Sequence, residues 1–205
     1  MRQLLLPLFL LLSLQRLAGQ DVEDPSLRKP YNLVVQTGIS LQWFETQYKA
    51  FTLSIERPLN LYNHFGVQAN FFFANDFYYY NQGVTNDSWE VAFFSKSFFR
   101  GRLTGRRSNA YIGPDMRFGR RHALYNSGFD LNLEKRTSST VKILVRMGWQ
   151  YHLGRLAVLE FSLPIGLEWA KFRDNAPQPS GFFYYGNNRT TQFVATPLLS
   201  LGVGF

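Results

Sequence analysis

The alternation of apolar and other residues between 138 and 171 limits what this chain can fold into more than any other feature. In "RLAVLEFSLPIGLEWAK" (155–171), every second residue is apolar, and the positions between them include two glutamates. In "SSTVKILVRMGWQYH" (138–152), one face is likewise apolar, and the other carries a lysine and an arginine. Successive side chains of a strand point to opposite faces of a sheet. The pattern therefore predicts two β-strands, each with one apolar face.

The short "LGR" segment between these strands predicts a hairpin. If residues 153–155 form the turn, Arg146 lies diagonal to Glu160, and Lys142 lies diagonal to Glu168. Cationic and anionic side chains then share the less apolar face.

Segments with similar alternation recur along the chain and bring the expected number of strands to eight. Most have the ~10 residues that a tilted transmembrane strand needs, whereas strands of soluble proteins are typically nearer five or six residues. The sequence therefore predicts an all-β protein, an eight-stranded antiparallel up-and-down transmembrane β-barrel. Besides the hairpin, its strands are expected at 31–43, 49–57, 64–75, 89–99, 109–119 and 191–205.

The N-terminus has the order of a secretory signal peptide. A charged start is followed by the apolar run "LLLPLFLLLSL" and then by small residues at 18 and 19. This run is shorter than the roughly 20 residues that a transmembrane helix needs. We therefore expect a signal peptide at 1–19 and an outer-membrane β-barrel at 20–205.

The links between the expected strands alternate in length, as they do in outer-membrane barrels, which have short periplasmic turns and longer outer loops. The segments at 58–63, 100–108 and 153–155 are mostly short, and those at 76–88, 120–137 and 172–190 are longer and polar.

The charge and composition of the chain limit the chemistry and the classes of partner that it can have. The chain has no cysteine, which excludes disulfides, thiolate metal sites and thiol catalysis. Its net charge is +8, but an exported protein does not meet nucleic acid.

Arg120 and Arg121, in an expected outer loop, are predicted to contact lipopolysaccharide phosphates, because guanidinium groups bind phosphate in bidentate fashion. The basic cluster at 100–107 is expected in a periplasmic turn, where it meets an acidic partner or is simply solvated.

The interior of such a barrel is just wide enough to be filled by its inward side chains. Because an unpaired buried charge is costly, we expect a solid polar core of paired charges. The alternative is a narrow ion pathway through the same groups, which Phe72 and Phe94 would obstruct if they point inward. The predicted charge network comprises Glu56, Asp115, Arg117, Lys142, Arg146, Glu160 and Glu168, with Gln36, Gln42, Thr52, Gln68 and Asn70 as inward polar neighbours.

Three stretches carry a family resemblance: "YIGPDMRFG", "MGWQYHLGRLAVLEFSLPIGLEWAKF" and the glycine-rich C-terminal strand. With them, nearly all of the mature chain resembles the small outer-membrane β-barrel proteins of Gram-negative bacteria, the class that includes the OmpA- and OmpX-like barrels. More narrowly, the stretches are similar to Bacteroidota-type barrels. The resemblance implies that a C-terminal aromatic residue is part of the signal read by the barrel-assembly machinery. Phe205 matches this position, with Leu201 and Val203 on the same face.

The expected function is structural or recognition at the cell surface, in contact with outer-membrane lipid and lipopolysaccharide. A role as an accessory subunit of an envelope complex, with a protein partner, belongs to the same hypothesis. The segments at 75–88 and 173–191 combine Tyr and Phe with Asn, Gly and Ser, as binding loops do. Alternatively, these aromatic residues belong to strand extensions that stand above the membrane.

A lipid A-modifying enzyme is the second class of function. It would need a histidine with a serine or carboxylate near the outer rim, and His122, with Ser127 and Asp130, is the one candidate. His64 and His152 fall by the short turns. The spacing matches no motif that we recognise, so we expect a solvated loop histidine, no catalytic role, no cofactor and no metal site.

Overall fold

The computed structural model describes residues 32–42, 48–60, 62–73, 82–84, 87–99, 108–126, 133–153, 157–172 and 189–205. The expected signal peptide, the basic cluster at 100–107 and much of the expected outer loops lie outside these residues. The strands are β1 (Val34–Gln42), β2 (Tyr48–Pro58), β3 (Asn63–Phe72), β4 (Gln82–Val84), β5 (Trp89–Phe98), β6 (Ser108–Asn126), β7 (Leu133–Leu153), β8 (Ala157–Phe172), β9 (Arg189–Ala195) and β10 (Leu198–Gly204).

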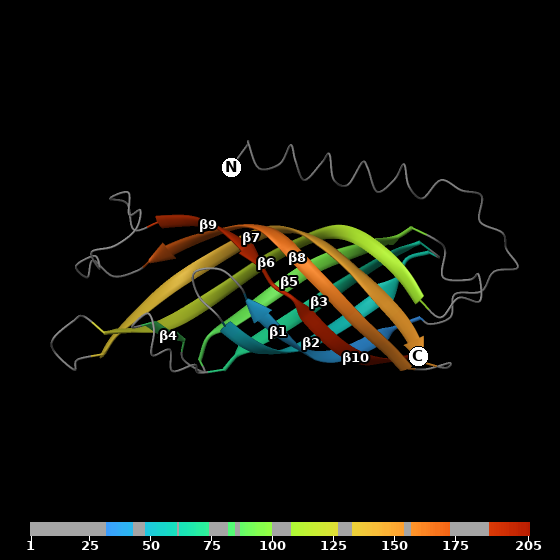
Figure 1. Cartoon of the computed structure of the whole chain (residues 1–205), viewed down its shortest axis with the longest axis horizontal. Coiled ribbons are helices and arrows are strands. Elements are labelled where there is room, and N and C mark those ends of the chain that lie inside the picture. The colour runs from blue at the N-terminus through green and yellow to red at the C-terminus, as the bar shows by residue number, and fades with distance from the viewer. Residues whose placement is uncertain are drawn as a thin grey trace, which may run out of the picture.

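The strands form one closed antiparallel barrel (Figure 1). Consecutive strands pair around the wall, and β10 closes it by pairing with both β8 and β1. Ten strands are assigned, but β9 and β10 together form one side of the barrel, because both pair with β8 in a single register. β4 pairs with β6 beyond the end of β5. The predicted eight-stranded antiparallel barrel is therefore confirmed.

Pro197, with Pro164 on the neighbouring strand, lies at the point where the last strand is assigned in two parts. Proline has no backbone N–H to donate to a neighbouring strand, and Pro197 lies between β9 and β10. The flanking groups remain bonded: the Thr196 N–H donates to the Pro164 carbonyl at 2.9 Å, and the Leu41 N–H donates to the Pro197 carbonyl at 2.9 Å. The wall is thus continuous through this break.

The register of the β7–β8 hairpin differs by two residues from the expected one. Pairing continues to Leu153 and Ala157, which moves the centre of the turn by one residue. Lys142 consequently lies directly opposite Glu168 rather than diagonal to it, and Arg146 lies opposite Pro164. A shift of two leaves every side chain on its predicted face, because the period of a strand is two.

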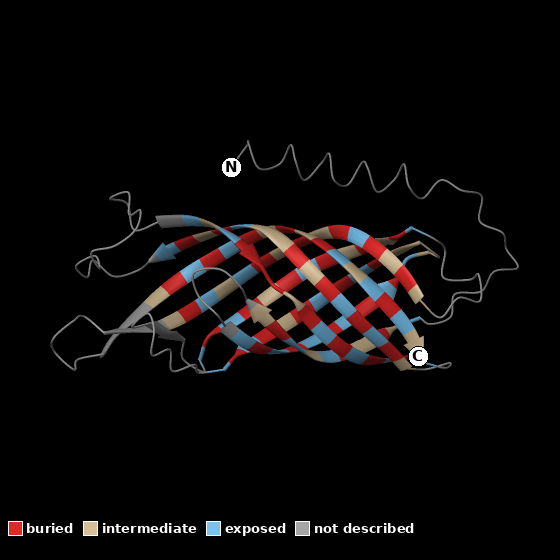
Figure 2. Cartoon of the chain, in the orientation of Figure 1, coloured by how far each residue is buried: buried red, intermediate tan, exposed pale blue. Residues whose placement is uncertain are grey.

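Burial alternates along the strands (Figure 2). Most of the buried, inward side chains are polar. Charged side chains such as Glu56 and Arg146 are buried, whereas large apolar ones such as Ile55, Phe161 and Leu201 are exposed. Soluble proteins distribute these residues the other way round. In lipid, only a closed barrel or a helix satisfies every backbone group. This is the distribution of a transmembrane barrel, in which the apolar wall faces lipid.

No helix among the described residues is long and apolar enough to cross a membrane.

Two strands rise well beyond the others at one end of the barrel. β6 has 19 residues and β7 has 21, against 9 to 11 in β1, β2 and β3. β6 pairs with β5 only as far as Arg120, and its last six residues add roughly 20 Å of strand at ~3.3 Å per residue. The expected outer loop at 120–137 is thus wrong, since strand occupies all of it that the structure describes.

A labelling experiment can test the inside and outside faces, because the natural chain has no cysteine. Spin labels on Leu159→Cys and Phe161→Cys are expected to collide with oxygen dissolved in the bilayer. A label on Ser162→Cys is not, because Ser162 is buried in the interior. Equal collision rates at adjacent positions, measured by power-saturation spectroscopy, would contradict the assignment of faces.

Candidate functional site: the barrel interior

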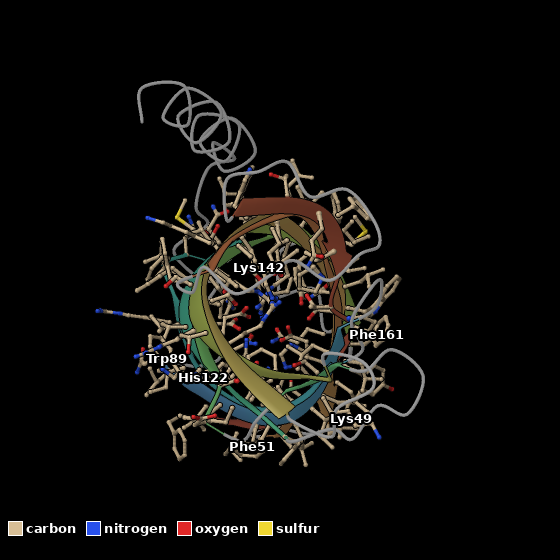
Figure 3. The ribbon with its side chains drawn as sticks, turned by 90° about the vertical axis from the view of Figure 1, so that its left-hand side faces the viewer. Lys49, Phe51, Trp89, His122, Lys142 and Phe161 are labelled. Atoms are coloured by element: carbon tan, nitrogen blue, oxygen red, sulfur yellow. The ribbon has the colours of Figure 1, made fainter. Side chains whose placement is uncertain are left out.

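All seven residues of the predicted charge network lie inside the barrel and are buried. They lie there because every second side chain of each strand points inward. The interior also contains four basic or acidic residues outside the predicted charge network: His64, Glu90, Lys96 and Arg121. Seen along its axis, the barrel has Lys142 inside, whereas Phe51, Trp89 and Phe161 lie outside (Figure 3).

An inner cluster of Glu56, His64, Lys96, Tyr111 and Glu160 fills the end at which the C-terminus lies. Glu56 binds both His64 Nδ1 and Lys96 Nζ. Lys96 Nζ is also 2.5 Å from Glu160 Oε2, and the Tyr111 hydroxyl donates to Glu160 Oε1 at 2.5 Å. Lys96, from β5, thereby joins carboxylates on β2 and β8.

Glu160 therefore has a different cation from the one expected. The hairpin register predicted Arg146 as its diagonal neighbour, but Glu160 pairs with Lys96, and Gln36 donates to it at 3.0 Å. The register shift removes the diagonal contact. His64, which the sequence places by a short turn, is the second residue of β3, and its side chain is buried in the interior beside Glu56.

A middle cluster surrounds Asp115 at about half the height of the barrel. Asp115 accepts hydrogen bonds from Arg117 (Nε 3.0 Å, Nη2 2.9 Å) and from Arg146 (Nε 2.9 Å). Arg146 also donates to the Gln68 side chain at 2.7 Å. Hydrogen bonds between ionised groups are shorter and stronger than neutral ones.

An outer cluster of Glu90, Arg121, Lys142 and Glu168 lies toward the end with the long strands. Lys142 Nζ is 2.6 Å from Glu90 and 3.6 Å from Glu168. Arg121 binds Glu168 with both terminal nitrogens, each at 2.7 Å. Arg117 connects this cluster to the middle one through a 3.2 Å contact with Glu90.

Arg121 is thus a correction to the predicted lipopolysaccharide contact. Its guanidinium points into the barrel and is buried against Glu168, so it does not face the membrane. Arg120, the preceding residue of β6, is exposed on the outside. Alternation separates two neighbouring arginines that a loop would have presented together.

Phe94 lies between the inner and middle clusters. Its ring centre is 4.0 Å from the Arg146 guanidinium carbon and 5.2 Å from Lys96 Nζ, so a cation contacts the ring from each cluster. Gly66 leaves the space for this ring, because a Cβ there would lie 2.3 Å from the Phe94 Cζ atom. The Phe72 side chain also points inward, and its ring centre is 5.8 Å from the Arg121 guanidinium carbon. Both rings therefore have the inward orientation in which the ion-pathway alternative expects them to be obstacles.

The buried charges of the described residues balance. Five carboxylates (Glu56, Glu90, Asp115, Glu160 and Glu168) face five cations (Lys96, Arg117, Arg121, Lys142 and Arg146), with His64 in addition. Every one of these cations has a carboxylate oxygen within 4.0 Å. Taking one partner away would leave the other charged in a dry site, at a cost of several kcal/mol. The interior is therefore a packed, mutually dependent set of ion pairs.

The histidine of the alternative enzyme hypothesis, His122, lies on β6 with its side chain only 12% exposed, so the prediction of a solvated loop histidine is wrong. His122 Nδ1 is 2.9 Å from the Thr137 hydroxyl, and His122 Nε2 is 3.9 Å from Asp87. Ser127 and Asp130 lie outside the described residues. No group of three or more metal-ligating side chains gathers anywhere in the described part of the chain.

The C-terminal residue takes part in closing the barrel. The Phe205 N–H donates to the Leu33 carbonyl at 2.8 Å, and the Phe205 carbonyl accepts from Asn32 at 2.6 Å. The side chains of Leu201, Val203 and Phe205 are exposed on the outer wall. Their role as an assembly signal stays a prediction.

No known protein-family profile matches this sequence, and no curated protein matches it significantly. Solved structures do match. Neisserial surface protein A is 12% identical, with a TM-score of 0.52, and the match covers 86% of this chain and 98% of that chain. Two further matches are the N-terminal β-barrel domain of Pseudomonas aeruginosa OprF (10% identity, 85% and 98% covered, TM-score 0.44) and the attachment invasion locus protein Ail of Yersinia pestis (13% identity, 84% and 96% covered, TM-score 0.47). The first match supports the fold alone, and the resemblance to Bacteroidota-type barrels has no support here.

Proposed function

We propose that this chain, which has the fold of the small eight-stranded outer-membrane barrels, resides in a bacterial outer membrane with a filled lumen and acts structurally or in recognition at the cell surface. The main observation in support of this proposal is the barrel interior, where five carboxylates pair with five cations around inward-pointing aromatic rings. A lumen filled in this way leaves little room for a substrate. The work of the protein then falls to its outer surface and its exposed end.

The long strands support an orientation. Outer-membrane barrels have short periplasmic turns and longer structures on the outside. In this chain β4, β6 and β7 extend from the end opposite the C-terminus (Figure 1). We assign that end to the cell exterior, where the extension would hold the connecting segments away from the membrane.

The extension suits recognition because it is built of paired strands. His122 pairs with Thr137 across β6 and β7, and the Ser88 hydroxyl accepts a hydrogen bond from the His122 N–H at 2.9 Å. Rigid support lowers the entropic cost of binding by the segments it carries. The aromatic segments at 75–88 and 173–191 are mostly outside the described residues, so their binding role stays a prediction.

Planar-bilayer recordings test the filled lumen. Wild-type barrel is expected to show no stable large conductance, because Phe94 and the paired charges occupy the cross-section. An open porin inserted into the same bilayer is the positive control. Porin-like steps from this chain would contradict the filled interior, and small cation- or anion-selective steps would favour the alternative of a narrow ion pathway.

Purification from native membranes tests the surface role. The tagged chain would be captured from detergent-solubilised outer membranes under conditions that preserve complexes. A stoichiometric transporter or assembly factor among the captured proteins would favour an accessory subunit. Capture with lipid alone would favour a stand-alone barrel, and absence of the chain from outer-membrane fractions would contradict the proposed location.

A further inference from the structure

We propose that a basic row on the outer wall, formed by Arg120, Ser139 and Lys171, binds the phosphate groups of lipid A in the outer leaflet. The inference rests on the proposed outer-membrane location and names a partner for it. It replaces the predicted pair Arg120 and Arg121, whose second member faces inward.

The pairing of the strands brings these residues into one row. Arg120 of β6 lies opposite Ser139 of β7, and Ser139 lies opposite Lys171 of β8. All three side chains are exposed on the outer wall. Neighbouring strands are ~4.8 Å apart, so the two cations start roughly 10 Å from each other. Their long side chains can meet above the short Ser139, whose hydroxyl adds a donor between them.

The row lies at the boundary of the apolar wall. Toward the middle of the barrel it is followed on its own strands by exposed or half-exposed apolar residues, which are Phe118, Val141 and Trp169. Trp89, 44% exposed, lies opposite Arg120. Aromatic residues of this kind gather where lipid tails give way to headgroups. The row therefore sits at the height where headgroup phosphates are expected.

The cations of the row differ from those of the interior in having no counter-charge among the residues that the structure describes. Neither Arg120 nor Lys171 forms an ion pair with any residue that the structure describes. The Asp87 carboxylate, two residues before Trp89 in the chain, lies 3.9 Å from His122 Nε2 instead. Arg189 occupies the next backbone position of the same row, opposite Lys171. Arg120 and Lys171 lie beside lipid without an ion-pair partner in the described part of the chain, which favours an anionic headgroup, because guanidinium and ammonium groups bind phosphate oxygens.

Lipid A is the occupant to which the geometry points, because a row with cations two strands apart suits a ligand with more than one phosphate. Native mass spectrometry of the chain recovered from membranes in detergent would measure binding of diphosphoryl lipid A. We expect wild type to bind it at least about fivefold more tightly than phosphate-free lipid A, and the Arg120→Gln/Lys171→Gln variant to lose this preference. Arg57→Gln is the matched control, since Arg57 is exposed on the same wall near the opposite end and should leave binding unchanged.

Equal binding by wild type and the double variant, or equal binding of lipid A with and without phosphates, would overturn the inference. Displacement of lipid A by millimolar inorganic phosphate, or equally tight binding of phosphatidylglycerol, would overturn its assignment to lipid A. Heat-modifiable mobility in gels checks that each variant is folded. A folded chain that fractionates with the outer membrane but fails these tests removes only the inference, whereas a chain absent from that fraction removes the proposed function.

Discussion

Replacing Lys96 with methionine is expected to lower the free energy of unfolding by about 3–5 kcal/mol, because it leaves buried carboxylates without their cation. Lys96 Nζ binds Glu56 and lies 2.5 Å from Glu160, and all three side chains are almost completely buried. Methionine fills a similar volume but cannot donate a hydrogen bond. Urea unfolding in lipid vesicles, followed by tryptophan fluorescence, would measure the loss.

Two companion variants make the Lys96 result interpretable. Arg57→Met also removes a cation, but from an exposed side chain, and should change stability by no more than about 0.5 kcal/mol. Lys96→Met combined with Glu160→Gln removes one of the stranded charges and should recover part of the loss. If Lys96→Met and Arg57→Met are equally mild, the interior does not behave as a dry network of ion pairs.

An arginine in place of Leu163 is expected to destabilise the barrel by about 2–4 kcal/mol, the cost of a cation on the lipid face near the bilayer midplane. Leu163 alternates with the buried Ser162 and Pro164 on β8, so its side chain belongs to the outer wall. The same unfolding experiment in vesicles measures the effect.

The control for Leu163→Arg uses the end of the neighbouring strand. Leu153, 46% exposed, lies on the same wall where β7 ends. Leu153→Arg should cost only about 0–1 kcal/mol, because a charge near the interface reaches water and headgroups. Equal costs at the two positions would mean that the wall does not face a hydrocarbon layer of the expected thickness.

The alternation in the sequence is sufficient to predict most of the strands and their faces, because a wall between lipid and a polar interior imposes a period of two on every strand. β8 shows this well: Phe161 and Leu167 are exposed, and Glu160 and Glu168 are buried, as predicted. The register shift of β7 and β8 leaves this result intact, since it moves the turn but keeps every side chain on its predicted face.

Alternation failed where both faces of a strand had the same character. In β5, Phe93 faces outward and Phe94 inward, so the strand reads as apolar on both faces and conceals the inward direction of Lys96. In β6, the polar sequence beyond Arg120 predicts a loop, but the strand continues there to Asn126. Arg121 was misplaced for the same reason.

The partners inside the barrel could not be derived from local sequence. Gln36 and Glu160 are 124 residues apart, yet their side chains bond at 3.0 Å. Which carboxylate meets Lys96 depends on the registers around the whole barrel and on the height at which each side chain enters. Composition predicted that inward charges would pair, but only the closed structure shows which of them do.

The pattern of ion pairs in the interior constrains how the barrel can fold and insert into the membrane. Each buried cation has at least one carboxylate partner on another strand, and Lys96 of β5 reaches across to β2 and β8. A hairpin of β5 and β6 crossing the bilayer alone would carry Lys96 into lipid without Glu56 and Glu160, which lie on β2 and β8, at a cost of several kcal/mol. Insertion in successive hairpins is therefore unfavourable. Membrane entry and the joining of the first strand to the last should occur as one cooperative step, with half-inserted intermediates too sparsely populated to be captured.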